Sequence, residues 1–221
     1  MQLKSIEHFA LAVSFVFPYV NLMRLKRKVS KMTNLNIMMV GVGGQGTLLA
    51  SRILGDVALK NGFDVKVSEV HGMSQRGGSV VTYVKMGEKI YSPLIEKGEA
   101  DVIMAFERLE AFRWVEFLKA GGTMLVNDQR IDPMPVITGN ATYPAEIIEK
   151  LSKKDAEIVS VNALEIAKIC GSIKAVNVVL IGMMASRTNI PKEQWISSLK
   201  EIVPAKVIDM NIRAFEEGYG L

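Results

Sequence analysis

The chain has 221 residues, 49% of them hydrophobic and 23% charged, so it has a globular composition and is long enough to bury a complete core. Its formal net charge of +4 is unevenly spread, because residues 1–35 carry a net +5 and residues 36–221 a net −1. A folded part this close to neutrality argues against nucleic-acid binding, which requires a basic surface.

Residues that hold metals and clusters are scarce. Cys170 is the single cysteine, and the two histidines, His8 and His71, lie far apart in the sequence. One thiol makes neither an internal disulfide nor the ligand set of a cysteine-rich zinc or iron–sulfur site. We therefore expect Cys170 to be buried and structural, with any redox metal of this system on another chain.

Residues 1–33 differ from the rest and are predicted to be an extension outside the folded domain. The uncharged run over residues 8–23 is interrupted by Pro18 and is shorter than the roughly 18–20 residues that a membrane span needs. The basic block follows this run, unlike that of a signal peptide. A helical extension, a membrane-surface helix and a misread start upstream of Met32 all remain open. We expect a dispensable extension and a cytoplasmic protein without a membrane span.

From residue 36 onward, strand-like and helix-like segments alternate. Apolar runs predict strands over 36–41, 64–70, 79–86, 100–106, 123–128 and 156–161. Helical periodicity predicts helices over 47–62, 107–122, 143–154, 162–171, 174–188, 191–202 and 206–220. The predicted fold class is α/β: a three-layer, Rossmann-like mixed sheet with helices on both faces and a helical C-terminal part, in one domain over 34–221.

The first strand passes into the first helix through the sequence GVGGQG, in which Gly41, Gly43 and Gly46 have the spacing G-x-G-x-x-G. Glycines permit a tight turn there, and the N–H groups at the start of the helix attract anions. Glu69 follows Gly46 by 23 residues, close to the place where a dinucleotide fold carries its ribose-binding acid. The turn by itself leaves an NAD or FAD site open.

The sequence SEVHGMSQRGGSVVTYV, residues 68–84, places several polar side chains in a short loop between the second and third strands. A parallel crossover needs a helix, for which this loop is too short, so we expect these two strands to be antiparallel. That topology differs from the one that binds nicotinamide cofactors.

Arg76 is the strongest candidate for a functional side chain in this loop. Its guanidinium can bind a carboxylate or phosphate through two hydrogen bonds, and the two following glycines expose N–H groups to the same anion. The alternative is a salt bridge that locks a subunit interface. Ser74 and Gln75 supply neutral hydrogen bonds to a ligand or within the loop. His71 either shuttles a proton or has a structural role.

Together, GVGGQG and SEVHGMSQRGGSVVTYV resemble the small, gamma-type subunit or domain of 2-oxoacid:ferredoxin oxidoreductases. Within that family, HGMSQRGG is most similar to the beta subunits of the indolepyruvate branch. The likeness continues through YSPLIEKGEADVIMAFERLEAFRW and covers about residues 34–218. Residues 1–31 depart from the family's pattern.

The resemblance implies the oxidative decarboxylation of arylpyruvates, such as indolepyruvate and phenylpyruvate, to aryl-acetyl-CoA and CO2 with reduction of ferredoxin. A large alpha subunit would carry thiamine diphosphate and [4Fe-4S] clusters, and CoA would be the co-substrate. This chain would hold no cofactor alone and would be inactive in isolation. Its implied site residues are Arg76, Gln75, Ser74 and His71 in the loop, and Gly43, Gly44, Gln45 and Gly46 at a CoA phosphate.

Three alternatives stay open at this point. The chain is then a gamma subunit of the pyruvate or 2-oxoglutarate type, a free-standing NAD(P)- or FAD-binding Rossmann reductase, or a structural scaffold for the alpha subunit.

Overall fold

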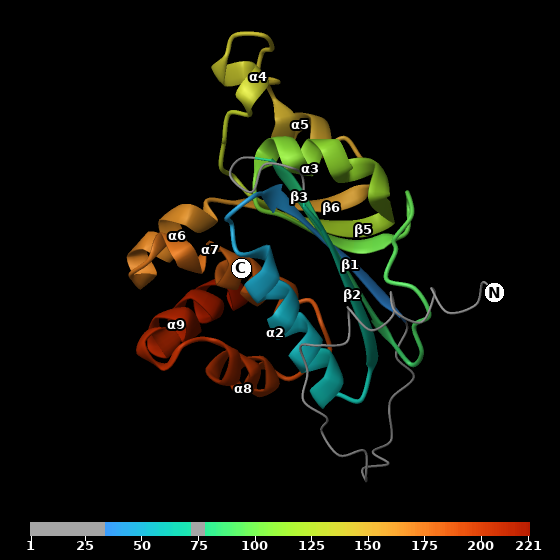
Figure 1. Ribbon diagram of the computed structural model, residues 1–221, viewed down its shortest axis with the longest axis vertical. Helices are drawn as coiled ribbons and strands as arrows, with labels where there is room; N and C mark the ends of the chain where they lie inside the picture. The colour runs from blue at the N-terminus through green and yellow to red at the C-terminus, as the bar shows by residue number, and fades with distance from the viewer. Residues whose placement is uncertain (1–33, 72–77) are drawn as a thin grey trace, which may run out of the picture. The chain divides into compact units, whose positions relative to one another are not determined.

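The computed structural model describes residues 34–71 and 78–221, which form a three-layer α/β fold around one six-stranded sheet (Figure 1). The strand order is β2-β3-β1-β4-β5-β6. The strands are β1 Leu35–Val42, β2 Asp64–His71, β3 Ser79–Gly87, β4 Ala100–Ala105, β5 Leu118–Asn127 and β6 Ala156–Val161. This architecture confirms the predicted fold class.

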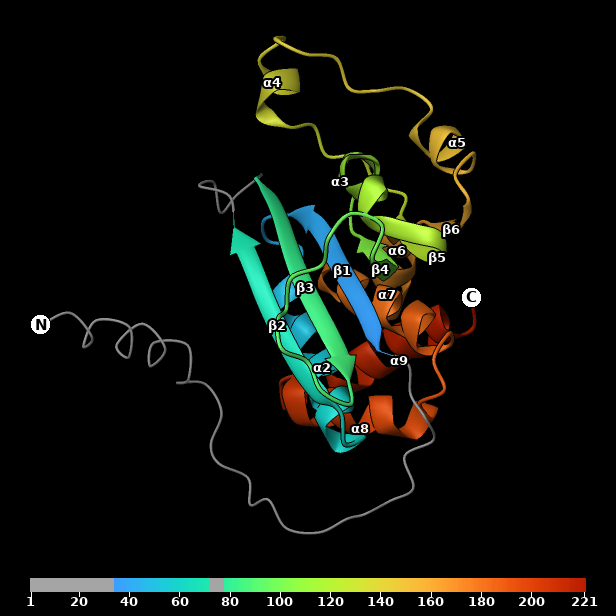
Figure 2. The same ribbon diagram turned by 90° about the vertical axis from the view of Figure 1, so that its right-hand side faces the viewer.

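Strand β3 makes the sheet mixed. It lies between β1 and β2 and is antiparallel to both, so that Val81 pairs with Val40 on one side and with Val70 on the other. The pairs β1–β4, β4–β5 and β5–β6 are parallel. Figure 2 shows β2, β3 and β1 side by side. The predicted antiparallel pairing of the second and third strands is confirmed.

Helices cover both faces of the sheet because β1 is apolar on both of its sides. Ile37 and Met39 belong to one hydrophobic cluster, whereas Met38 and Val40 belong to the other. The first cluster is shared with α2 Thr47–Lys60, α6 Ala163–Cys170, α7 Val176–Ala185, α8 Lys192–Ile202 and α9 Ile208–Tyr219. The second is shared with α3 Arg108–Trp114 and α5 Ile147–Leu151. Alternating side chains on a strand with two covered faces give this division.

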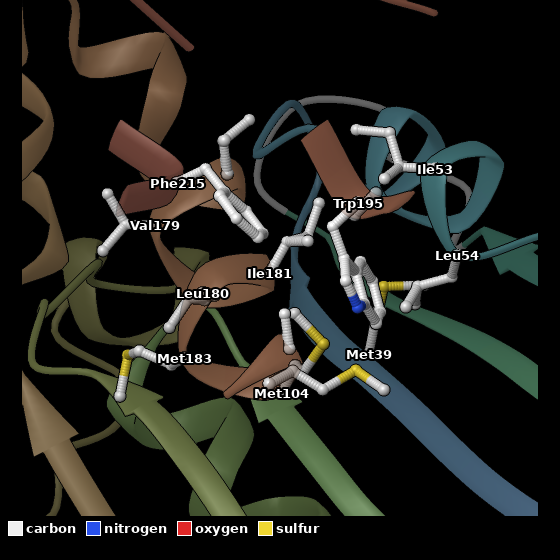
Figure 3. Packing of buried hydrophobic residues seen from close by; sticks show 14 of the residues in the cluster. Met39, Ile53, Leu54, Met104, Val179, Leu180, Ile181, Met183, Trp195 and Phe215 are labelled. Atoms are coloured by element: carbon white, nitrogen blue, oxygen red, sulfur yellow. The ribbon is translucent and has the colours of Figure 1, made fainter. Parts of the chain in front are cut away.

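Helix α7 is the centre of the first cluster. All ten of its residues are buried, as expected of a helix that is apolar on every side. Figure 3 shows its side chains between Met104 of the sheet, Trp195 of α8 and Phe215 of α9. Met183 and Cys170 are buried in this cluster, so their assignment to the core is confirmed.

Two predicted helices were wrong in length. The segment 107–122 is helical only to Trp114; a 3-10 turn, Val115–Phe117, follows it and β5 begins at Leu118. Gly121, which suggested a helix stop, lies within β5 with a φ of 69°. The segment 143–154 is helical only over Ile147–Leu151, because Glu146 has a φ of 56° and cannot continue a helix backwards. The short helix α4, Met134–Ile137, was not predicted.

Across residues 34–71 and 78–221, no helix has both the length and the apolar character that a bilayer crossing requires. The uncharged run over residues 8–23 lies outside these ranges.

Helices α7 and α9 approach each other so closely that only glycine fits at their contact. A Cβ on Gly182 would lie 2.2 Å from the Phe215 carbonyl oxygen. We predict that Gly182→Ala lowers the free energy of unfolding by about 1–3 kcal/mol, because the helices must separate. Gly55→Ala in α2 is the control: its Cβ would meet nothing within 4 Å, so a gain of about 0.5–1 kcal/mol is expected. Urea unfolding of both variants measures the difference, and equal effects would contradict this account.

Candidate functional site

The glycine turn lies at the carboxyl edge of the sheet, where the strand order changes direction. After β1 the chain runs through α2 to β2 on one side, whereas β4 pairs with β1 on the other side. Ligands of open α/β sheets bind in the crevice at such a switch point. The geometry therefore places the GVGGQG sequence where the fold presents a site.

Contacts within the protein explain two of the glycines. A Cβ on Gly41 would lie 2.7 Å from Gln45 Oε1 and 3.0 Å from the Phe106 Cβ. Gly46 has a φ of 83°, and a Cβ there would lie 2.7 Å from Asn177 Nδ2, which donates to the Gly46 carbonyl at 3.1 Å. Gly41 and Gly46 thus leave room for two side-chain amides.

The side chain of Gln45 fixes the turn. Its Oε1 accepts from the Val42 N–H at 2.7 Å, and its Nε2 donates to the Phe106 carbonyl at 3.0 Å. The same carbonyl accepts from Nδ2 of the fully buried Asn127 at 3.0 Å. Gln45, which we expected at a bound phosphate, therefore uses its side-chain amide to join the ends of β1, β4 and β5.

A cavity of about 310 Å³ opens beside the turn. Its lining residues are Gly43, Gly44, Gly46, Thr47, Leu48, Glu69 and Val80. The first turn of α2 carries no acidic side chain, and Gly46 at its N-cap offers no capping group. A helix start of this kind attracts anions. The structure thus brings three of the four predicted cofactor-binding glycine-turn residues and Glu69 to one cavity, although β3 separates β2 from β1.

The second predicted motif adjoins the first. Ser74, Gln75 and Arg76 lie outside the described residues, while His71 is the last residue of β2 and pairs with Val80 in the strand register. Just beyond the motif, the Gly78 carbonyl accepts from the Gly43 N–H at 3.0 Å. The glycine turn and the end of the HGMSQRGG segment are therefore neighbours.

Sequence reasoning missed Glu110, which anchors the start of β3. Its side chain is buried and accepts from Ser79 Oγ at 2.6 Å, from Arg113 at 2.7 Å and from the Trp114 Nε1 at 3.3 Å. These donors compensate the burial of the carboxylate. In the sequence it resembles the polar face of a helix, which gave no signal of its burial.

Glu107 was missed for the same reason, although its residue is only 1% exposed. Oε1 accepts from the Tyr143 hydroxyl at 2.5 Å and from the Ile131 N–H at 3.1 Å, while Oε2 accepts from the Glu110 N–H at 3.0 Å. One carboxylate thereby caps α3 and holds both ends of the 131–143 segment. Burial, and then the hydrogen bond to Glu107, raises the pKa of Tyr143.

A second cavity, of about 320 Å³, lies beside this cluster. Its lining includes Arg108, Arg130 and Tyr143. Arg108 is paired with Asp128, and Arg130 is paired with Asp132 at 2.6 Å while its guanidinium lies 4.4 Å from the centre of the Tyr143 ring. These arginines already have carboxylate partners, so the anion-binding character of the glycine-turn cavity is the stronger of the two.

Among the side chains that the structure describes, no group of three His, Cys, Asp or Glu residues is arranged to hold a metal ion.

The role of Gln45 as both donor and acceptor can be tested by removing the donor alone. Gln45→Glu keeps an acceptor for the Val42 N–H but sets an oxygen against the Phe106 carbonyl. We expect a loss of about 1–3 kcal/mol in unfolding free energy at neutral pH. Gln129→Glu is the matched control, because Gln129 Oε1 only accepts, from Asn127 at 3.0 Å. Similar losses in both variants, measured by urea unfolding, would contradict the assigned role.

Tyr143 should make stability fall at alkaline pH. Its pKa is raised in the folded state, so its contribution is complete below the unfolded value of about 10 and is lost as pH rises above that value. Tyr143→Phe should be less stable at neutral pH by about 1–3 kcal/mol, because Glu107 loses a donor. The difference between the two proteins should shrink above pH 10. Unfolding curves between pH 7 and 11 test this, and a constant difference would refute it.

The comparisons with known proteins agree with this geometry. The family model described as pyruvate ferredoxin/flavodoxin oxidoreductase matches residues 36–221. The indolepyruvate oxidoreductase subunit IorB of Thermococcus kodakarensis is 43% identical over 192 residues, covering 85% of this chain and 95% of the relative. The common subunit gamma of the pyruvate/ketoisovalerate oxidoreductases of the same organism is 26% identical, covering 81% and 92%.

The fold is also found in a solved structure of 2-oxoglutarate:ferredoxin oxidoreductase from Magnetococcus marinus with 2-oxoglutarate, coenzyme A and succinyl-CoA bound. The TM-score is 0.68 at 20% identity, over 86% of this chain and 31% of that one. With the family match and the relative at 43% identity, these findings show that the chain belongs to the pyruvate ferredoxin/flavodoxin oxidoreductase family.

Proposed function

We propose that this chain is the subunit of a complex that oxidises arylpyruvates such as indolepyruvate and phenylpyruvate. The comparisons support a subunit of a 2-oxoacid:ferredoxin oxidoreductase. The observation that favours the arylpyruvate branch is the identity of 43% with the indolepyruvate relative against 26% with the pyruvate/ketoisovalerate one. The HGMSQRGG sequence supports the same branch.

The reaction proposed for the complex converts an arylpyruvate anion and CoA into aryl-acetyl-CoA, CO2 and one proton, with two electrons passing to two ferredoxins. When bound in the alpha subunit, thiamine diphosphate stabilises the carbanion left by decarboxylation and [4Fe-4S] clusters take the electrons. The single cysteine of this chain does not fit a cluster, which needs four thiolates. We place the complex in the cytoplasm of an organism that works under reducing conditions.

The contribution of this chain is to bind and orient. The cavity at the glycine turn has the anion-attracting helix start that a CoA phosphate requires, and the solved relative from Magnetococcus is described with coenzyme A bound. Arg76, with the N–H groups of the glycines after it, is proposed to bind the carboxylate of the 2-oxoacid or a phosphate of CoA at the alpha subunit. Ser74, Gln75 and His71 would complete that contact.

Co-expression with the candidate alpha subunit tests the substrate assignment. A chain starting at Met32 is expressed anaerobically with and without that subunit, and CoA-dependent reduction of ferredoxin is followed with indolepyruvate, pyruvate and 2-oxoglutarate. We expect a stable complex that prefers indolepyruvate and a lone chain that is inactive. Preference for pyruvate or 2-oxoglutarate would instead assign the gamma type. A lone chain that arrives with bound NAD or FAD would assign a Rossmann reductase.

Arg76→Ala separates a catalytic role from a scaffolding role. We expect the variant complex to assemble normally and to lose at least about tenfold in turnover, because a charge-assisted pair is worth 1.5–3 kcal/mol. Arg76→Lys retains the charge but not the planar fork, so it should recover only part of the rate. Size-exclusion chromatography checks assembly. Intact turnover with impaired assembly would favour the scaffold.

A further inference from the structure

The hydroxyl of Thr47 is a polar group without an assigned task. Thr47 is the first residue of α2, is only 6% exposed and lines the cavity at the glycine turn. Its Oγ1 forms no hydrogen bond with any residue in the described ranges. The Ser51 hydroxyl of the same helix, in contrast, donates to the Leu48 carbonyl at 2.9 Å. A buried hydroxyl that faces a cavity without a partner indicates a ligand atom there.

Backbone donors lie next to this hydroxyl. Within residues 34–71 and 78–221, the N–H groups of Gly44, Gly46 and Thr47 have no protein acceptor. The two hydrogen bonds of Gln45 hold the turn that carries them. Three backbone donors and a hydroxyl at the start of a 14-residue helix match the acceptor oxygens of a phosphate group.

Glu69 restricts the kind of phosphate. Its carboxylate lines the same cavity, so it disfavours a simple anion and favours a ligand that also presents a hydroxyl. A carboxylate offers about four acceptor sites and can accept such a hydroxyl in addition to its existing interaction. A ribose with a phosphate and a free hydroxyl on adjacent carbons brings both groups at once.

We propose that this cavity binds the 3′-phosphoribose end of CoA, with Thr47 Oγ1 and the turn N–H groups donating to the 3′-phosphate. Glu69 then accepts from the 2′-hydroxyl. The exposed side chain of Leu48, at the cavity rim, offers apolar surface to the attached adenine. This assignment rests on the proposed function for the identity of CoA, and it goes beyond that function by naming which end of CoA the chain holds and through which side chains.

Calorimetry on the complex with the alpha subunit tests the assignment, with CoA and 3′-dephospho-CoA as probes. We expect the native complex to bind CoA at least about tenfold more tightly than 3′-dephospho-CoA, because hydrogen bonds to a charged group are lost. Thr47→Val should remove most of that preference. Thr82→Val is the matched control: Thr82 is fully buried, does not line the cavity and should keep the preference. Loss of preference in both variants, or in neither, overturns the assignment.

Two further measurements separate the remaining explanations. Glu69→Ala should weaken CoA binding several-fold; tighter binding would mean that Glu69 only repels the phosphate and would overturn its role. Excess NAD+ should not displace CoA, and displacement would give the site to a dinucleotide. Binding is measured without turnover, so an inactive complex that still discriminates the two probes refutes the proposed function alone. An active complex without discrimination refutes this inference alone.

Discussion

Two buried amides share one carbonyl oxygen, and the arrangement of the site depends on this contact. The Phe106 carbonyl, just after β4, accepts from Gln45 after β1 and from Asn127 at the end of β5. Three neighbouring parallel strands are thereby joined at their carboxyl ends by bonds that do not belong to the sheet ladder. Buried polar groups need such partners, so the turn has one favoured conformation and presents its donors in a fixed direction.

The sheet supplies the rigid support for that turn. Because β1 is apolar on both faces, it is fixed between two hydrophobic clusters, and α7 secures the first cluster from within. Asn177, near the start of α7, connects this support to the turn through its bond to the Gly46 carbonyl. The core and the site therefore meet at one buried amide, and a change in the packing of α7 is expected to reach the cavity.

The sequence allowed the strands, the antiparallel β2–β3 pair and the position of the turn to be predicted, because each follows from local periodicity or loop length. The helix over 107–122 was wrong since Gly121 marks a bend within a strand, and only pairing with β4 and β6 reveals the strand. Glu107 and Glu110 were missed because a buried acid on a helix looks like a solvated one until its partners, distant in sequence, are known. Gln45 was placed at the turn, but its inward direction depends on Phe106, 61 residues away.

The clamp at Glu107 also has a consequence for how this family can vary. Its carboxylate fixes Ile131 and Tyr143, so the chain between them closes on itself irrespective of its contents. Doubling the length of a flexible loop with fixed ends costs only about 0.6 kcal/mol in closure entropy. Insertions and deletions around α4 should therefore be tolerated by the fold, which makes this segment a place where related subunits can acquire different lengths without rebuilding the sheet.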